Sequence, residues 1–314
     1  MPGAARAPQG RRKGAARARL ESRAVPELPD LAILADALDA GLVGRPMLGA
    51  TTPQSLVVRG TPAELAEFKG QVLNSVARRG KFLVFEFERD RMVVNAMLTG
   101  RLGFAVPKSK PWPQTAAVIE FGPVAATPKS RPQKWIGGAD WLPAPDEPVE
   151  MRYRDSTRMG KIYLMPAGVT RAVAGWDEQG PEADDPALTL DVWRARIAKH
   201  NGELKNLLRN QSFVSGIGNA YSDEILWEAR LAPFRTRASL APTEVDALYE
   251  ATRKVLSWAI EELRRLVPPR LELEQRKFLN VHWKGGEPCP RCGTRISEVK
   301  AGGFVTNWCR GCQR

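Results

Sequence analysis

The stretch CPRCGTRISEVKAGGFVTNWCRGC, residues 289–312, contains all four cysteines of this 314-residue chain. They form two Cys-x2-Cys pairs, Cys289 with Cys292 and Cys309 with Cys312. Four thiolates at this spacing are typical of a tetrahedral zinc site, with the segment between the pairs forming a β-hairpin. All four coordination positions would be filled by cysteine. We therefore expect one structural zinc ion, with a redox-active pair or chance spacing as the alternative.

A second signal lies upstream, in VSGIGNAYSDEIL, residues 214–226. Gly216-Ile217-Gly218-Asn219 predicts a tight turn before a helix that begins near Ser222. Such a turn exposes backbone N–H groups at the positive end of a helix and suits a phosphate. Lys205 and Asn219 would add a charge and an amide donor. Taken alone, this motif is more often a plain connection between two helices.

The N-terminal half reads mostly as β-structure. Leu83, Phe85 and Phe87 alternate along one predicted face, and the turn that follows them leads into an antiparallel partner. The segments expected to be regular are a helix at 30–42 that stops at Gly41, and strands at 81–87, 92–97, 115–121 and 149–155. Short connections of this kind predict a sandwich or a barrel, with a long Pro- and Gly-rich loop at 122–148.

The C-terminal half reads as helical up to the cysteines. An acidic, turn-rich linker covers residues 175–186. Residues 188–202 follow as a helix that ends at Asn201-Gly202. Thr243 is expected to cap a long helix that Pro268-Pro269 stops.

Charge and composition narrow the function. The net charge is +12 and the pI about 9.8, which favours a polyanionic partner such as nucleic acid. Residues 1–25 carry seven basic residues against Glu21 alone, so half of the excess lies there. The chain lacks a run of 18 apolar residues or a secretory signal, and we expect a cytoplasmic protein. With only His200 and His282 available, a hydrolase that uses a histidine base is poorly supplied. The candidate nucleophiles reduce to a lysine or a terminal amine.

Five motifs, taken in order, resemble the formamidopyrimidine-DNA glycosylase/endonuclease VIII family. They are PELPD at 26–30, RRGKFL at 78–83, LTGRL at 98–102, VSGIGNAYSDEIL at 214–226 and KGGEPCPRCGT…CRGCQR at 284–314. The resemblance implies an α+β multidomain protein with an N-terminal β-sandwich, a helical helix-two-turn-helix domain and a C-terminal zinc-finger β-hairpin. The implied boundaries are a disordered basic tail or mis-assigned start at 1–25, the catalytic sandwich at 26–174, the linker at 175–186, the helix-two-turn-helix domain at 187–270 and the zinc finger at 271–314.

The same resemblance implies a DNA repair enzyme. Members of the family remove a damaged base from double-stranded DNA and cleave the strand at the abasic site, as glycosylase and lyase. We expect an oxidised base as the substrate, and a bacterial, nucleoid-associated monomer with no membrane partner.

The resemblance assigns catalytic roles to three residues. The family's nucleophile is an N-terminal proline amine, here Pro26. An α-amino group titrates near 8, about two units below a lysine, and is therefore much more often a free base at neutral pH. Glu27 matches the proton-shuttling carboxylate, although its residue type alone suggests an acid at a helix start. Lys81 matches a lysine that contacts a phosphate, and otherwise reads as a solvated strand residue. Lys205 and Asn219 match phosphate-clamping positions.

Several positions depart from the family pattern. Phe304 replaces an arginine of the zinc-finger hairpin, and a phenyl ring cannot pair with phosphate. An Arg-Arg-Phe run typical of an 8-oxoguanine preference is here Thr157-Arg158-Met159. Met159 can still wedge into the base stack, whereas Thr157 cannot give bidentate recognition of a base. Leu98 occupies the other wedge position.

Two further replacements, Asn95 for a common histidine and Asp30 for a frequent glutamate, point the same way. Together these changes favour oxidised pyrimidines, abasic sites or single strands over 8-oxoguanine.

The position of Pro26 leaves two function classes open. Translation that begins at a GTG codon for Val25, followed by removal of the initiating methionine, would make Pro26 terminal and its nitrogen a nucleophile. If residues 1–25 stay attached, that nitrogen is an amide, and the chain is a catalytically inactive DNA-binding protein of the same fold. We expect the start at Val25. A generic zinc-ribbon protein explains neither PELPD nor the central motif.

Overall fold

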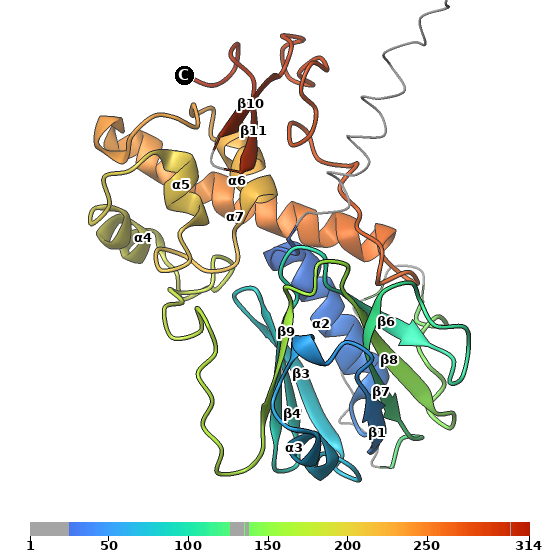
Figure 1. The fold of residues 1–314 in the computed structure, drawn as a ribbon. Coiled ribbons are helices and arrows are strands. Elements are labelled where there is room, and N and C mark those ends of the chain that lie inside the picture. Colours follow the sequence, from blue (N-terminus) through green and yellow to red (C-terminus); the bar gives the residue numbers. More distant parts are fainter. Residues whose placement is uncertain (1–24, 126–134, 136–137, 302) are drawn as a thin grey trace, which may run out of the picture.

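The computed structural model describes residues 25–125, 135, 138–301 and 303–314. Its lower part in Figure 1 is a β-sandwich, and its upper part is a group of helices with a small β-hairpin. Helix α7 runs between the two parts, and α2 contacts both α7 and strand β3. Within the described residues, no helix is long and apolar enough to cross a membrane.

The two sheets of the sandwich share one apolar core, in which Phe87 and Phe121 stack with ring centroids 6.4 Å apart. The five-stranded sheet has the order β2-β9-β5-β4-β3, with β2 Val58–Arg59, β3 Leu73–Arg79, β4 Phe82–Phe87, β5 Arg91–Asn95 and β9 Lys161–Met165. The four-stranded sheet has the order β1-β7-β8-β6, with β1 Met47–Thr51, β6 Arg101–Ala105, β7 Thr115–Phe121 and β8 Val149–Arg154. The predicted sandwich is confirmed.

The alternation in strand β4 has the predicted consequence. Leu83, Phe85 and Phe87 point into the core between the sheets, whereas Phe82 and Val84 pack on the opposite face with Trp176 and its neighbours. Strand β5 pairs antiparallel with β4, as the sequence indicates. Period-two spacing places alternate side chains on opposite faces, and here both faces are covered.

The remaining elements are mostly helical. They are α2 Leu28–Leu42, η1 Ser55–Val57, α3 Pro62–Glu67, α4 Leu190–Ile197, α5 Leu204–Arg209, α6 Asn219–Glu228, η2 Arg237–Ser239, α7 Pro242–Leu266 and the hairpin β10 Ser297–Ala301 with β11 Phe304–Trp308. A second apolar core joins α4, α5, α6 and α7. The region from 122 to 148 has no helix or strand among its described residues; its positions 126–134 and 136–137 lie outside them.

Helix α2 ends at Leu42, as expected, and the missing side chain of Gly41 lets the helix approach Phe104; a Cβ there would lie 2.5 Å from that ring. Three other expected helix ends are wrong. Helix α7 begins at Pro242 rather than after Thr243, since proline needs no N–H partner in a first turn. Helix α6 begins at Asn219, not near Ser222.

Helix α4 also ends earlier than predicted. It stops at Ile197 instead of reaching 201–202, and the amides of Lys199 and His200 bond to carbonyls three residues back. A tightened last turn of this kind satisfies the amides while the helix stops.

Candidate active site and nucleic-acid interface

The PELPD segment lies against the glycine turn that precedes α6. The Leu28 amide donates to the Gly216 carbonyl at 3.0 Å. The Glu27 carboxylate accepts the amides of Gly218 at 2.6 Å, Ala220 at 2.8 Å and Tyr221 at 3.2 Å. The turn therefore binds an internal carboxylate, and the expectation that these amides face a phosphate is wrong.

The two glycines of this turn are needed for different reasons. Gly216 has φ +97°, a left-handed conformation that disfavours other residues. Gly218 faces the Glu27 side chain, and a Cβ at 218 would lie 2.4 Å from the Glu27 carboxyl carbon. The G-x-G motif thus makes room for Glu27 at the start of α6, where the helix dipole favours a negative charge.

Arg276 also binds Glu27, and no sequence motif identifies this residue. Its guanidinium lies 3.3 Å from Glu27 Oε1 and 2.6 Å from Asp30 Oδ2, and it donates to the Val25 carbonyl at 3.0 Å. The side chain is buried, in the segment between α7 and the cysteines. No spacing rule links residue 276 to residues 25–30, so only the tertiary contact identifies it.

The charges around Glu27 keep it ionised. Burial alone would raise the pKa of Glu27, but Arg276, Lys81 and the Ala220 amide outweigh burial and leave the pKa below its ordinary value. A buried carboxylate at this position is a stable anion directly beside Pro26. The arrangement suits stabilisation of a developing positive charge at the proline nitrogen.

Lys81 follows a sharp turn between β3 and β4, where Gly80 has φ +56°. The Gly80 amide donates to Glu182 at 2.5 Å, so the acidic linker fixes the turn. Burial lowers the pKa of Lys81, and Glu27 partly opposes that effect. Lys81 and Glu27, separated by six elements of secondary structure, are therefore electrostatic neighbours.

A pocket opens beside Pro26. Its lining includes Pro26, Asp30, Gly100, Arg101, Glu274 and Arg276. Arg101 donates to Glu274 at 2.8 Å, and burial raises the pKa of Glu274 to about 7 despite Arg276 and Arg101. This pocket connects the proline to the loop that carries Leu98.

Two loops carry the predicted wedge residues, and Asp155 joins them. Its carboxylate accepts the hydroxyl of Thr99 and the amide of Gly160, the latter at 2.8 Å. Met159 is exposed and Leu98 is half-buried at the tips of these loops. Arg158 is also exposed, with φ +57°. The structure thus brings the two loops together, although they are 60 residues apart in the sequence.

Lys205 and Asn219 both hold the zinc-finger hairpin. Lys205 Nζ and Asn219 Nδ2 donate to the Val305 carbonyl at 3.0 and 2.9 Å. Lys205 is also paired with buried Asp223 at 2.6 Å. Both residues are therefore engaged within the protein, and their part in phosphate binding stays a prediction.

The His282 ring is buried and contacts other side chains of the protein. Its Nδ1 lies 2.8 Å from Asp223 Oδ2, and the ring is buried. Asp223 thus joins His282 to Lys205 below the hairpin. The ring packs within the protein, against Trp283.

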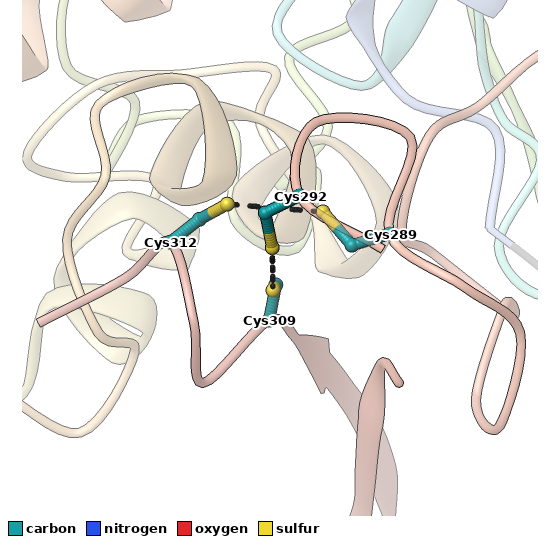
Figure 2. A group of neighbouring side chains, drawn as sticks. All are labelled: Cys289, Cys292, Cys309 and Cys312. Carbon is teal, nitrogen blue, oxygen red and sulfur yellow. Dashed lines mark hydrogen bonds between the residues drawn. The ribbon is translucent and has the colours of Figure 1, made fainter. Parts of the chain in front are cut away.

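The four cysteines form one metal site (Figure 2). Their sulfur atoms all lie within 4.8 Å of one another, with 3.4 Å between Cys292 and Cys309 and 3.8 Å between Cys289 and Cys312. Zinc–sulfur bonds of about 2.3 Å in a tetrahedron require sulfurs roughly 3.8 Å apart. The donor set fits one structural zinc ion, which fixes the two ends of the β10–β11 hairpin.

Three family models match the chain. The formamidopyrimidine-DNA glycosylase N-terminal domain matches residues 25–162, the formamidopyrimidine-DNA glycosylase H2TH domain matches 179–266, and the zinc finger found in FPG and IleRS matches 286–314. The third match agrees with the cysteine cluster described above.

Curated relatives extend over nearly the whole chain. A formamidopyrimidine-DNA glycosylase of Thermomicrobium roseum is 30% identical and aligns with 92% of this chain and 99% of its own length. One from Symbiobacterium thermophilum is also 30% identical, with 92% and 89% covered. A third, from Pelotomaculum thermopropionicum, is 28% identical, with 92% and 99% covered.

Solved structures share the fold. The Lactococcus lactis Fpg in complex with DNA containing an abasic site has a TM-score of 0.76 at 23% identity, covering 92% of this chain and 99% of that one. The wild-type Lactococcus lactis Fpg with DNA containing N7-benzyl-Fapy-dG gives the same TM-score and identity, covering 92% and 100%.

Proposed function

Because this chain belongs to the formamidopyrimidine-DNA glycosylase family, we propose that it removes a damaged base from DNA and cleaves the resulting abasic site with the amine of Pro26. One observation carries the catalytic assignment. Glu27, directly beside Pro26, is buried and ionised on three backbone amides and Arg276. A buried charge of this kind is costly unless it is used or paired, and here it lies beside the reacting nitrogen.

The chemistry follows from a secondary amine. The Pro26 nitrogen attacks C1′ of the damaged nucleotide, the C1′–base bond breaks, and the base leaves with a proton from water. The Glu27 carboxylate passes the amine proton to O4′ as the C1′–O4′ bond breaks, and the open sugar is left as an iminium ion with a positive charge. The same carboxylate stabilises this cation and accepts the C2′ proton. Loss of the C2′ proton then expels the 3′ phosphate and cleaves the strand.

This mechanism requires a free amine, so we propose that the active form begins at Pro26. A second candidate function has its own support. The Val25 carbonyl accepts a hydrogen bond from buried Arg276 at 3.0 Å, so the intact Val25–Pro26 peptide bond is accommodated. With that bond intact, the chain binds DNA without catalysis.

The proposed DNA contacts follow the geometry of the site. Leu98, Met159 and Arg158 would enter the base stack from their two joined loops, in a manner typical of wedge residues. Lys81 would contact a phosphate, with Lys205 and Asn219 supporting the hairpin on the other side.

The proposed preference for one kind of damaged base rests on the side chain of Thr157. Its hydroxyl bonds to Asp155 at 3.0 Å and lies 2.9 Å from that of Thr99, so it is engaged within the loop. An oxidised pyrimidine or an abasic site therefore fits better than 8-oxoguanine opposite cytosine. We propose a monomer that acts in the bacterial cytoplasm, at the nucleoid.

The test compares the 314-residue chain with a form that begins at Pro26. Each is incubated with DNA containing an abasic site and with borohydride, which reduces the iminium ion to a stable covalent adduct. We expect an adduct only with the shorter form, and peptide mapping should place it on Pro26.

Two other outcomes would change the proposal. An adduct that maps to Lys81 would contradict the role of Pro26 while leaving the lyase activity. Tight binding of abasic DNA by both forms, with an adduct from neither, would establish the second candidate function.

A further inference from the structure

A cation–π contact joins helix α5 to the zinc-finger hairpin. The Arg209 guanidinium carbon lies 3.5 Å from the centroid of the Phe304 ring. Arg209 is the last residue of α5, and Phe304 is the first residue of β11, next to the hairpin turn. The Phe304 side chain is 43% exposed, so this ring is at the protein surface. A guanidinium in this position is fixed in orientation by the aromatic face.

Arg209 has no counter-charge of its own. In the parts of the chain that the structure describes, no carboxylate lies within ion-pair distance of its guanidinium, and it makes no hydrogen bond. Lys205, one turn earlier in the same helix, is by contrast paired with Asp223. Arg209 is half-buried, and burial lowers its pKa. A partly desolvated cation without a partner is unfavourable unless an anion binds to it.

The surroundings add to this excess of positive charge. Arg209 repels Lys81 and thereby contributes to its lowered pKa, so the two cations are neighbours. Glu27 is the carboxylate that most strongly raises the pKa of both cations, and it is already bound by three amides and Arg276. Lys81 and Arg209 therefore lie in one positively charged region, whose two influential carboxylates, Glu27 and Asp223, are already bound within the protein.

A phosphodiester fits this region. A guanidinium that stacks one face on an aromatic ring keeps the N–H groups of its edge free, and these match two phosphate oxygens. Phe304 itself cannot bind phosphate, and it stands where an arginine is expected from the family resemblance. We propose that Arg209, held flat on Phe304, binds a backbone phosphate of DNA and supplies from helix α5 the guanidinium that the hairpin lacks. This proposal rests on the proposed function, because it takes DNA as the ligand.

Salt-dependent binding tests the proposal on the 314-residue chain. The probe is a DNA duplex with one tetrahydrofuran abasic analogue, titrated at several salt concentrations. Each phosphate contact contributes about 0.9 to the slope of log affinity against log salt. Arg209→Met should weaken binding about tenfold near 0.1 M salt and reduce the slope by about one. Arg209→Lys should keep the slope, and Phe304→Ala should weaken binding less than Arg209→Met does.

Moving the guanidinium from residue 209 to residue 304 tests whether the charge, rather than the packing of Arg209, is what binds DNA. Arg209→Met combined with Phe304→Arg should restore both affinity and slope, because the guanidinium returns from the other side of the same contact. Lys69→Met removes an exposed charge two residues after α3, a helix of the sandwich far from the zinc-finger hairpin in Figure 1, and should change neither. Zinc content and melting temperature are measured for every variant, so that a folding defect is recognised.

The outcomes distinguish this proposal from the proposed function. An unchanged slope in a folded, zinc-loaded Arg209→Met variant would overturn the role of Arg209. A double variant that stays as weak as Arg209→Met would do the same. If the unaltered chain itself does not bind the abasic duplex, the proposed function fails first.

Discussion

Glu27 and Glu224 have almost the same hydrogen-bonding environment and opposite electrostatics. Glu27 accepts three backbone amides at the start of α6. Glu224, further along the same helix, accepts the amides of Asn280, Val281 and His282 at 2.8–2.9 Å. Both carboxyl groups are buried. The pKa of Glu27 is nevertheless lowered, whereas burial raises the pKa of Glu224.

The difference is the nearby cation. Arg276 and Lys81 act on Glu27, whereas the three amides at Glu224 are not enough to outweigh its burial. A third carboxyl, Glu274, has Arg276 and Arg101 but leaves one oxygen without a hydrogen bond, and its pKa rises to about 7. At Glu27 the amides, Arg276 and Lys81 together outweigh burial, whereas the partners of Glu224 and of Glu274 do not. The region around Glu27 is thus suited to chemistry, and the region around Glu224 holds the zinc-finger segment in place.

The sharpest test of this comparison replaces each glutamate by glutamine in the form that begins at Pro26. Glu27→Gln should slow borohydride trapping on abasic DNA by about 10²–10⁴-fold, because glutamine neither carries a negative charge nor relays a proton. Glu224→Gln should leave the trapping rate within about threefold and cost roughly 1–3 kcal/mol of unfolding free energy. Equal losses of rate in both variants would refute the division of roles.

Removal of zinc should disorder the zinc-finger hairpin next to the Glu224 region and leave the Glu27 region folded. Chelation frees the ends of the β10–β11 hairpin, so Lys205 and Asn219 lose their fixed acceptor at Val305. Affinity for an abasic duplex should fall about tenfold to a hundredfold in a binding titration. Far-UV circular dichroism should keep the signals of the sandwich and of α7, and added zinc should restore binding. Loss of the whole fold would indicate that the finger stabilises both regions.

A single added methyl group should displace the Glu27 carboxylate from its hydrogen-bond partners. Gly218→Ala introduces a Cβ 2.4 Å from the Glu27 carboxyl carbon, which must displace the carboxylate from its amides. We expect a loss of about 2–3 kcal/mol in urea unfolding, together with slower trapping. Gly202→Ala is the matched control, since its Cβ would have nothing within 4 Å. If Gly218→Ala unfolds like the control, Glu27 does not depend on this close approach.

The smallest effect concerns Glu274 and depends on pH. Its folded pKa of about 7 lies above the ordinary value of 4.5, so the stability it contributes is complete below pH 4.5 and is lost as the pH rises through 7. Glu274→Gln removes this loss. The variant should match the unaltered chain at pH 5 and be more stable by about 1–2 kcal/mol at pH 8, as measured by urea unfolding. A variant that is less stable at pH 8 would mean that Arg276 needs the Glu274 charge.

Local patterns predicted much of the fold. Alternation in 83–87 placed its side chains on the correct faces, and Pro268-Pro269 correctly marked the end of α7. The errors fell at helix ends, where single residues decide how the first or last turn is satisfied. Thr243 reads as a cap, but Pro242 already lies in the first turn of α7.

The sequence alone determined the chemistry of groups that are close together in the chain. The spacing from Cys289 to Cys312 is enough for a zinc site, because the ligands of one metal ion lie in one short hairpin. The pairing of Pro26 with Glu27 is likewise a matter of adjacent residues. In both cases, covalent connection brings the groups together.

Only the tertiary structure decided which buried groups are ionised and which hydrogen-bond donors already have a partner within the protein. The amides of the glycine turn bind Glu27, Arg276 keeps it ionised, and Arg209 lies on Phe304. These partners come from distant segments, and packing of the two cores brings them together. The pKa of a buried group depends on every charge and amide within a few ångströms, and no spacing in the chain specifies that set.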